Sequence, residues 1–272
     1  MNTVEISTPA LALGYLLLLI PLSLMMWTGV PLVRKTWLAV VRMTVQLLFV
    51  GLYLQVVFRI DHYSLTLAWL IAMILVADIS IVRGCDLRLG RFYSPLFIAL
   101  FAGTMVPLIY MVSLLFDGSP LLKAQYAIPI GGMILGNCLR ADIIGISRFY
   151  ESLKKDEKSY LHALAQGARL SEATRPYLRD AFHAALAPTI ATMSTIGLVS
   201  LPGMMTGVIL AGANPMMAIK YQILIMLAIF SGTALTVALA IVLTRKSSFT
   251  AYGILDKTIF KAGPSKKPKD KK

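Results

Sequence analysis

Four ionisable side chains interrupt the long apolar stretches of this sequence: Arg42, Asp78, Arg140 and Asp142. An ionisable residue within a membrane-spanning helix is costly, so it usually faces a partner or a water-filled cavity. Helical spacing adds further polar side chains, because residues three or four apart are neighbours on a helix. We therefore predict a polar vestibule, a candidate translocation pathway built from Arg42, Gln46, Asp78, Asn137, Arg140 and Asp142. The alternative is that the arginines extend to the membrane surface and pair with the aspartates, which would only lock helix packing.

Soft ligands for a metal ion are also present. Thioether sulfur suits copper(I) and some late transition metals, and the candidates in the last third of the chain are Met193, Met204, Met205 and Met226. In so apolar a chain, most of the 14 methionines are expected to serve packing. The three histidines are scattered across loops and lack the spacing of metal ligands. The residues therefore leave the ligands of any metal unassigned.

Several kinds of enzyme are excluded by missing motifs. The chain has no G-x-x-x-x-G-K-[ST] loop, so it is not expected to bind a nucleotide through a P-loop. It also lacks HExxH, GxSxG and paired catalytic carboxylates. We therefore expect no catalytic residues and no cofactor bound by this chain. Cys85 and Cys138 lie where a disulfide is not expected.

The elements that must position these residues are apolar runs long enough to cross a bilayer. Hydrophobic residues make up 57% of the chain, and about 20 apolar residues suffice for one helical span. Runs of 18 or more without alternation predict helices, because lipid leaves no other partner for the backbone. The fold class is therefore all-α, a polytopic membrane protein with about seven spans: 9–30, 37–58, 65–82, 95–116, 126–146, 184–213 and 219–243.

Basic residues fall into every second loop. The loops 31–36, 83–94, 147–183 and 244–272 hold 21 of the 26 Lys and Arg residues. By the positive-inside rule these loops are cytoplasmic, which places the N-terminus outside and the C-terminus inside. The net charge of +13 is thus mostly a topology signal. It predicts contact with membrane lipids and no nucleic-acid partner.

We expect one transmembrane domain over residues 1–246 and a basic cytoplasmic tail over 247–272 that is disordered at its end. Within this domain, 147–183 is the longest polar stretch, and its pattern predicts two short amphipathic helices on either side of Gly167. Such a segment either lies on the lipid surface or docks a cytoplasmic partner.

The sixth run, 184–213, is too long for one straight crossing. Leu201-Pro202-Gly203 interrupts it, and proline removes a backbone donor while glycine frees the chain. We predict a broken helix or a re-entrant segment here; the alternative is one long tilted helix with a proline kink. Glycines spaced by four, Gly132 with Gly136 and Gly203 with Gly207, allow close helix approach, although this spacing is common in membrane helices.

A long motif covers this break: Leu198-Val-Ser-Leu-Pro-Gly-Met-Met-Thr-Gly207, then Ile209-Leu-Ala-Gly212 and Pro215. It closely resembles the FetB-type permeases, the membrane subunits of bacterial iron-export ABC transporters, which are related to plant aluminium-tolerance permeases. Other matching pieces are Val41-Arg42 with Gln46, Gly136-Asn137, Ala163-Leu-Ala-Gln-Gly-Ala168 and Tyr221-Gln222-Ile223. The similarity extends over roughly residues 34–245.

The resemblance implies a permease of the bacterial inner membrane that exports iron or another metal. A separate ATP-binding subunit would supply ATP and Mg, and two copies of this chain would form a homodimer. It also implies roles for two groups of residues. Ala163, Gly167 and Ala168 would couple the permease to the ATPase, and an outer gate or hinge would comprise Pro202, Gly203, Met204, Met205, Thr206 and Gly207.

Two other functions fit some of the residues. An ABC permease for an organic anion or a sugar nucleotide would suit the positive charges of Arg42 and Arg140. An ATP-independent channel or carrier is the third, although the spans show no evident inverted repeat.

Overall fold

The structure is a computed structural model that describes residues 7–85, 87–115, 123–250 and 252–259. Every regular element in these ranges is a helix, which confirms the all-α class. Six of the described helices, or runs of joined helices, are long and apolar enough to cross a membrane: Pro9–Trp27, Val33–Ile60, Tyr63–Gly84, Gly90–Leu115, Ala124–Lys155 and Pro215–Ser248. The chain is an integral, multi-pass membrane protein.

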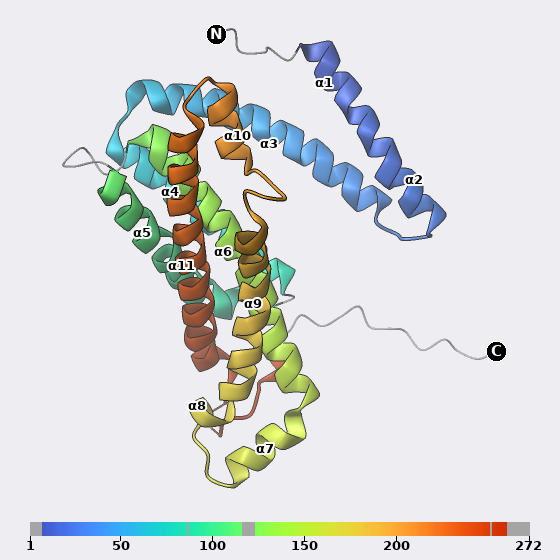
Figure 1. Cartoon of the computed structure of the whole chain (residues 1–272). Helices are drawn as coiled ribbons and strands as arrows, with labels where there is room; N and C mark the ends of the chain where they lie inside the picture. The colour runs from blue at the N-terminus through green and yellow to red at the C-terminus, as the bar shows by residue number, and fades with distance from the viewer. Residues whose placement is uncertain (1–6, 86, 116–122, 251, 260–272) are drawn as a thin grey trace.

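The first two candidate spans project from the rest of the molecule (Figure 1). α1 (Thr8–Gly14), the 3₁₀ turn η1 (Tyr15–Leu18) and α2 (Leu19–Trp27) form one of them, and α3 (Val33–Ile60) forms the other. Tyr15 and Thr44 share a hydrogen bond of 2.6 Å that joins the two. Val57 is the only buried residue of α3, so nearly all of its apolar surface is exposed.

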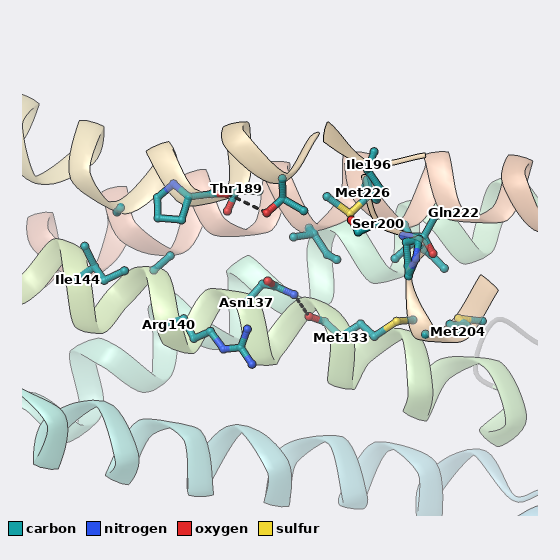
Figure 2. A pocket seen from close by; sticks show the side chains of 18 residues that line it. Met133, Asn137, Arg140, Ile144, Thr189, Ile196, Ser200, Met204, Gln222 and Met226 are labelled. Carbon is teal, nitrogen blue, oxygen red and sulfur yellow. Dashed lines mark hydrogen bonds between the residues drawn. The ribbon is translucent and has the colours of Figure 1, made fainter. Parts of the chain in front are cut away.

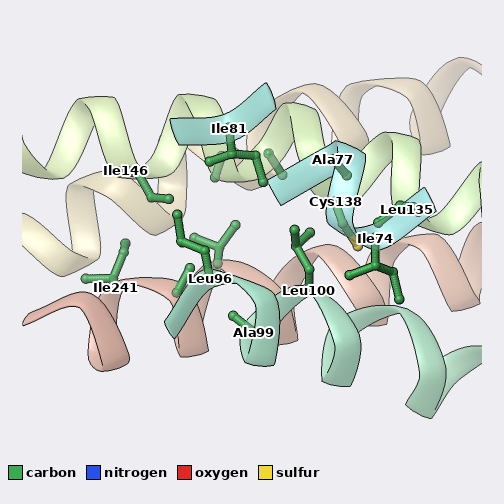
Figure 3. Packing of buried hydrophobic residues seen from close by; sticks show 14 of the residues in the cluster. Ile74, Ala77, Ile81, Leu96, Ala99, Leu100, Leu135, Cys138, Ile146 and Ile241 are labelled. Atoms are coloured by element: carbon green, nitrogen blue, oxygen red, sulfur yellow. The ribbon is translucent and has the colours of Figure 1, made fainter. Parts of the chain in front are cut away.

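The remaining long helices form a bundle (Figure 1): α4 (Tyr63–Gly84), α5 (Leu89–Leu115), α6 (Ala124–Lys155), α9 (Arg175–Thr195) and α11 (Pro215–Ser248). Its core is apolar and continuous. Figure 3 shows Ile74, Ala77 and Ile81 of α4 meeting side chains of the neighbouring helices, among them Leu96, Leu100, Leu135, Cys138, Ile146 and Ile241.

Glycines allow the closest helix contact, between α5 and α11. A Cβ added at Gly232 would lie 2.6 Å from the carbonyl oxygen of Gly103, and one added at Gly103 would lie 2.6 Å from the Cβ of Thr236. The glycine pairs singled out from the sequence are different. A Cβ at Gly136, Gly203 or Gly207 would meet nothing within 4 Å, and one at Gly132 would meet only the flexible end of Met73. Within this chain, these pairs therefore do not mark a close helix contact.

The predicted sixth span is not one helix. α9 ends at Thr195, the backbone of Ile196 is extended (φ −62°, ψ 137°), and α10 (Gly203–Leu210) begins only after Pro202. Gly197 has φ +88°, a conformation that favours glycine, and its N–H donates to the carbonyl of Ser200 at 2.9 Å. The run is thus a broken helix, and the alternative of one long kinked helix is excluded.

The polar stretch after α6 folds into α7 (Glu157–Ala165) and α8 (Leu170–Ala173), on either side of Gly167. Figure 1 shows this pair at the opposite end of the bundle from α10; we call the two ends the α7–α8 end and the α10 end. α6 continues to Lys155 and α9 starts at Arg175, so the spanning helices take up much of the stretch expected to be a loop.

The segment after α11 folds back along the α7–α8 end. Asp256 donates its N–H to the carbonyl of Ser248, Arg88 donates to the carbonyl of Ile259, and η2 (Lys257–Ile259) follows. Arg91 forms an ion pair with Asp256. The last part of the predicted tail, 260–272, lies outside the described residues.

Candidate functional site

A cavity of about 390 Å³ opens beside the interrupted helix. Four elements supply its walls: α6, α9, α10 and α11, together with the non-helical segment 196–202. Figure 2 shows its labelled side chains: Met133, Asn137, Arg140, Ile144, Thr189, Ile196, Ser200, Met204, Gln222 and Met226. We call it the break cavity.

A second cavity of about 410 Å³ adjoins it and is more apolar. The two share four lining residues: Ile196, Pro202, Gln222 and Met226. The non-helical segment 196–202 therefore lies between the two cavities. A rearrangement at 196–202 would change both.

Polar groups in the break cavity are few and distinct. Asn137 donates to the carbonyl of Met133 at 2.8 Å, which leaves its own amide oxygen free to accept (Figure 2). Gln222 is 8% exposed and, within the described chain, its side-chain amide makes no hydrogen bond. Arg140 adds a positive charge, and none of the lining residues is acidic. Hydrogen-bonding groups among apolar walls are typical of sites for small polar molecules.

The structure separates the six residues of the predicted pathway into three places. Asn137 and Arg140 line the break cavity. Asp78 and Asp142 are fully buried in the core of the bundle, and Arg42 and Gln46 are exposed on α3. Over the residues described, the one ion pair is between Arg91 and Asp256, so the arginines do not pair with the aspartates and the packing-lock alternative was wrong.

The residues of the predicted gate, 202–207, end the non-helical segment and form the first part of α10. Pro202, Gly203 and Met204 line the break cavity, while Pro202 and Met205 line the second cavity. Thr206 uses its hydroxyl within α10, where it donates to the carbonyl of Pro202 at 3.1 Å. These residues therefore form the start of α10, and several of them line one or both cavities.

Three polar lining residues were not singled out from the sequence as part of a site: Thr189, Ser200 and Gln222. The signal for Gln222 was present, because it is a lone amide at the start of a long apolar run. The two hydroxyl residues gave no such signal, since hydroxyls inside helices commonly bond to their own backbone. Thr192 of α9, which also lines the cavity, does so here, because its hydroxyl donates to the carbonyl of Pro188 at 3.0 Å.

Gly167 ends α7 in a Schellman motif. Its N–H donates to the carbonyl of Leu164 at 2.9 Å, and the N–H of Ala168 donates to the carbonyl of Ala163 at 3.1 Å. Gly167 has φ +90° and is exposed, whereas Ala163 and Ala168 pack against the core. These three residues thus shape a tight turn at the tip of the α7–α8 end.

Buried tyrosines hold α7 in place. Tyr160 is 2% exposed and donates its hydroxyl to the carbonyl of Gly253, and its ring meets Tyr177 of α9 edge-on at 6.2 Å. Burial raises the pKa of Tyr160 to about 12, so this hydroxyl stays protonated. These contacts of Tyr160 anchor α7, the helix that ends in the turn at Gly167, to the rest of the bundle.

Metal ligands of the usual kinds do not converge in the described part of the chain: no three His, Cys, Asp or Glu side chains come together. Three methionines, Met133, Met204 and Met226, do line the break cavity.

The chain also matches a known protein family. The model of the uncharacterised protein family UPF0014 matches residues 8–249. The chain belongs to the UPF0014 family. The broken helix, the break cavity and the α7–α8 turn all lie within the matched range. No solved structure matches the chain.

Among its UPF0014 relatives is the Escherichia coli protein named "Probable iron export permease protein FetB". It is 31% identical over 251 residues, which cover 92% of this chain and 95% of that protein. The Bacillus subtilis membrane protein YjkA is 33% identical over 79% of this chain and 84% of its own length. The Arabidopsis thaliana protein ALUMINUM SENSITIVE 3 is 31% identical over 80% of this chain and 78% of its own.

Proposed function

We propose that this chain is the membrane-spanning permease subunit of an ATP-driven exporter and that the break cavity holds the cargo. The observation that carries the proposal is the non-helical backbone at 196–202, between α9 and α10, beside that cavity. At membrane depth, irregular backbone is tolerated only where it is buried in protein or lines a cavity. Broken helices of this kind commonly form the binding sites of transporters.

The energy source is proposed to be a separate ATP-binding subunit that binds ATP and Mg. The name of the Escherichia coli relative, which describes an iron export permease, and the lack of a P-loop in this chain support this partner. The exposed turn at Gly167 would dock against it, with Ala163 and Ala168 holding the turn on the bundle. Because ABC ATPases act as pairs, the permease would work as a homodimer, in the inner membrane of a bacterium.

The cargo is proposed to be iron or another metal ion, moved from the cytoplasm outwards, with residues 202–207 acting as a gate or hinge. One observation favours a second candidate. Arg140 lines the break cavity without an acidic residue among its neighbours there, and a fixed positive charge suits an organic anion or a sugar nucleotide.

Transport into inside-out vesicles would test the function. Vesicles that contain this chain and its ATPase should accumulate labelled iron(II) when ATP is added, and loss of either subunit should abolish uptake. An assembled, ATP-hydrolysing complex that takes up no iron would refute the metal cargo. If organic anions then stimulate its ATPase activity and Arg140→Gln removes that stimulation, the second candidate replaces the first.

A pair of amide variants would test the cavity. Asn137→Ala removes one hydrogen-bonding group from the break cavity, worth about 1 kcal/mol, so transport should fall about fivefold. Gln46→Ala is the matched control, because Gln46 is exposed on α3 and does not line the cavity. Equal loss in both variants, with normal assembly, would show that the pathway is not confined to the break cavity.

A further inference from the structure

Two aspartates lie in the bundle core, away from the break cavity. Asp78 of α4 and Asp142 of α6 are each 0% exposed, and neither lines the break cavity or the cavity beside it. Apolar residues close to them in sequence, Ala77, Ile81, Cys138 and Ile146, are labelled in Figure 3. These four residues pack against the apolar side chains of α5 and α11. The carboxyl groups are thus enclosed by hydrocarbon.

Most of their oxygen atoms lack a hydrogen-bond partner in the part of the chain described. Both carboxyl oxygens of Asp78 and the Oδ1 of Asp142 have none. The Oδ2 of Asp142 accepts a hydrogen bond from the hydroxyl of Thr236 at 2.8 Å. Asp78 is also near enough for its charge to act on Asp142. Buried polar atoms are nearly always satisfied, so three open acceptors within one core point to something bound.

Nothing in the surroundings compensates two negative charges. The buried residues of the described chain include no Lys, Arg or His. The other buried titratable side chains of the core are Cys138 and Tyr150 of α6, Tyr160 of α7 and Tyr177 of α9, and α4, α5 and α11 add none that is buried. An isolated buried carboxylate loses its hydration, and two of them repel one another. The pair must therefore take up positive charge while the helices are packed.

The packing at this level leaves little room for that charge. Thr236, which donates to Asp142, also lies close to Gly103. A Cβ added at Gly103 would lie only 2.6 Å from the Cβ of Thr236. One helical turn away, an added Cβ at Gly145 would lie 2.9 Å from Val237. A metal ion with water ligands needs more space, and no third acidic, cysteine or histidine ligand converges here within the described residues. A proton needs no space at all.

We propose that Asp78 and Asp142 form a proton-binding site in the membrane core, which holds at least one proton while α4, α5, α6 and α11 are packed together. The proton is lost when these helices separate and water reaches the carboxyl groups. This site is distinct from the break cavity, and it would link the packing of the bundle to pH whatever the cargo is.

Infrared spectroscopy of the purified full-length chain in dodecyl maltoside micelles, which contain no ester carbonyl groups, would test the site directly. A protonated carboxylic acid has a carbonyl stretch that an ionised carboxylate lacks. At about pH 7, solvent-exposed aspartates and glutamates are ionised, so the wild type should show this band only from the buried pair. Asp78→Asn and Asp142→Asn should each weaken it, and the double variant should abolish it. Asp180→Asn, which changes an exposed carboxylate of α9, should leave it unchanged.

A folded wild type without this band, or a band that survives in the folded double variant, would overturn the proposal.

Thermal unfolding gives a second readout that works even if one variant folds poorly. The midpoint temperature of wild-type unfolding should decrease as the pH rises from about 5 to about 9, because deprotonation leaves charge buried in the core. The asparagine variants should lose this dependence, since the amide copies the neutral acid. Parallel profiles would refute proton binding. Rescue of the wild type alone by sodium, potassium or magnesium at high pH would assign a metal cation instead.

Discussion

Gly232→Ala should force α5 and α11 apart. The new Cβ would lie 2.6 Å from the carbonyl oxygen of Gly103 and 2.9 Å from the Cγ2 of Ile134. A carbon and a carbonyl oxygen approach comfortably to about 3.3 Å, so the backbones must separate by about 0.7 Å. The contacting atom belongs to a backbone carbonyl, and a carbonyl within a helix cannot rotate away.

The cost follows from two opposing terms. Overpacking of a well-packed core costs about 1–3 kcal/mol, while replacing a helical glycine by alanine returns about 0.5–1 kcal/mol through backbone entropy. We therefore expect a net loss of about 1–2 kcal/mol in the free energy of unfolding. Gly103→Ala should behave similarly, because its Cβ would lie 2.6 Å from that of Thr236.

Reversible unfolding of the purified protein in mixed detergent micelles would measure this difference. Gly136→Ala on α6 is the matched control, because its Cβ would meet nothing within 4 Å; it should leave stability unchanged or raise it by up to about 1 kcal/mol. Wild-type stability in Gly232→Ala would refute the close α5–α11 contact. Equal destabilisation in Gly232→Ala and Gly136→Ala would show that the loss reflects glycine removal in general.

Two further predictions concern the α7–α8 end. Gly167→Ala should destabilise the turn by about 1–2 kcal/mol, because an L-residue is strained at φ +90°; Gly167→Asn should cost less, since asparagine tolerates this region better. Faster amide exchange around 163–170 would report the loss, and wild-type exchange in Gly167→Ala would contradict it. Hydrogen bonds from Thr258 and Arg91 lower the pKa of Asp256 from 3.8 to about 2. Its stabilising contribution is therefore complete above about pH 4 and is lost as the pH falls towards 2. Arg91→Gln should raise this pKa in an NMR titration, and an unchanged value would show that the ion pair is absent in solution.

Most of the fold was predictable from the sequence. The runs expected at 65–82 and 219–243 correspond to α4 (Tyr63–Gly84) and α11 (Pro215–Ser248), since a bilayer sets the length of each helix. The break was predictable as well, because proline followed by glycine cannot continue a regular helix. Its extent was not: the helix ends at Thr195, well before Pro202.

The candidate site could be predicted only in part. Asn137 and Arg140 were singled out as polar residues of an apolar run, and both line the break cavity. Asp78 and Asp142 were expected beside them, but α6 turns Asp142 into the core while Arg140 faces the cavity. Two residues along a helix are about 200° apart, so neighbours in sequence point to nearly opposite sides.

The sequence by itself determined the helical class, six of the membrane spans and the position of the break. These depend on local terms: the backbone must satisfy its own hydrogen bonds in lipid, and run length matches bilayer thickness. Only the tertiary structure decided which helix faces meet. In a soluble protein, hydrophobic periodicity would mark the buried face, but lipid is as apolar as the core, so both faces of a spanning helix look alike. The contact between Gly103 and Gly232, the burial of Asp78 and the convergence of Asn137 with Gln222 therefore follow from helix packing alone.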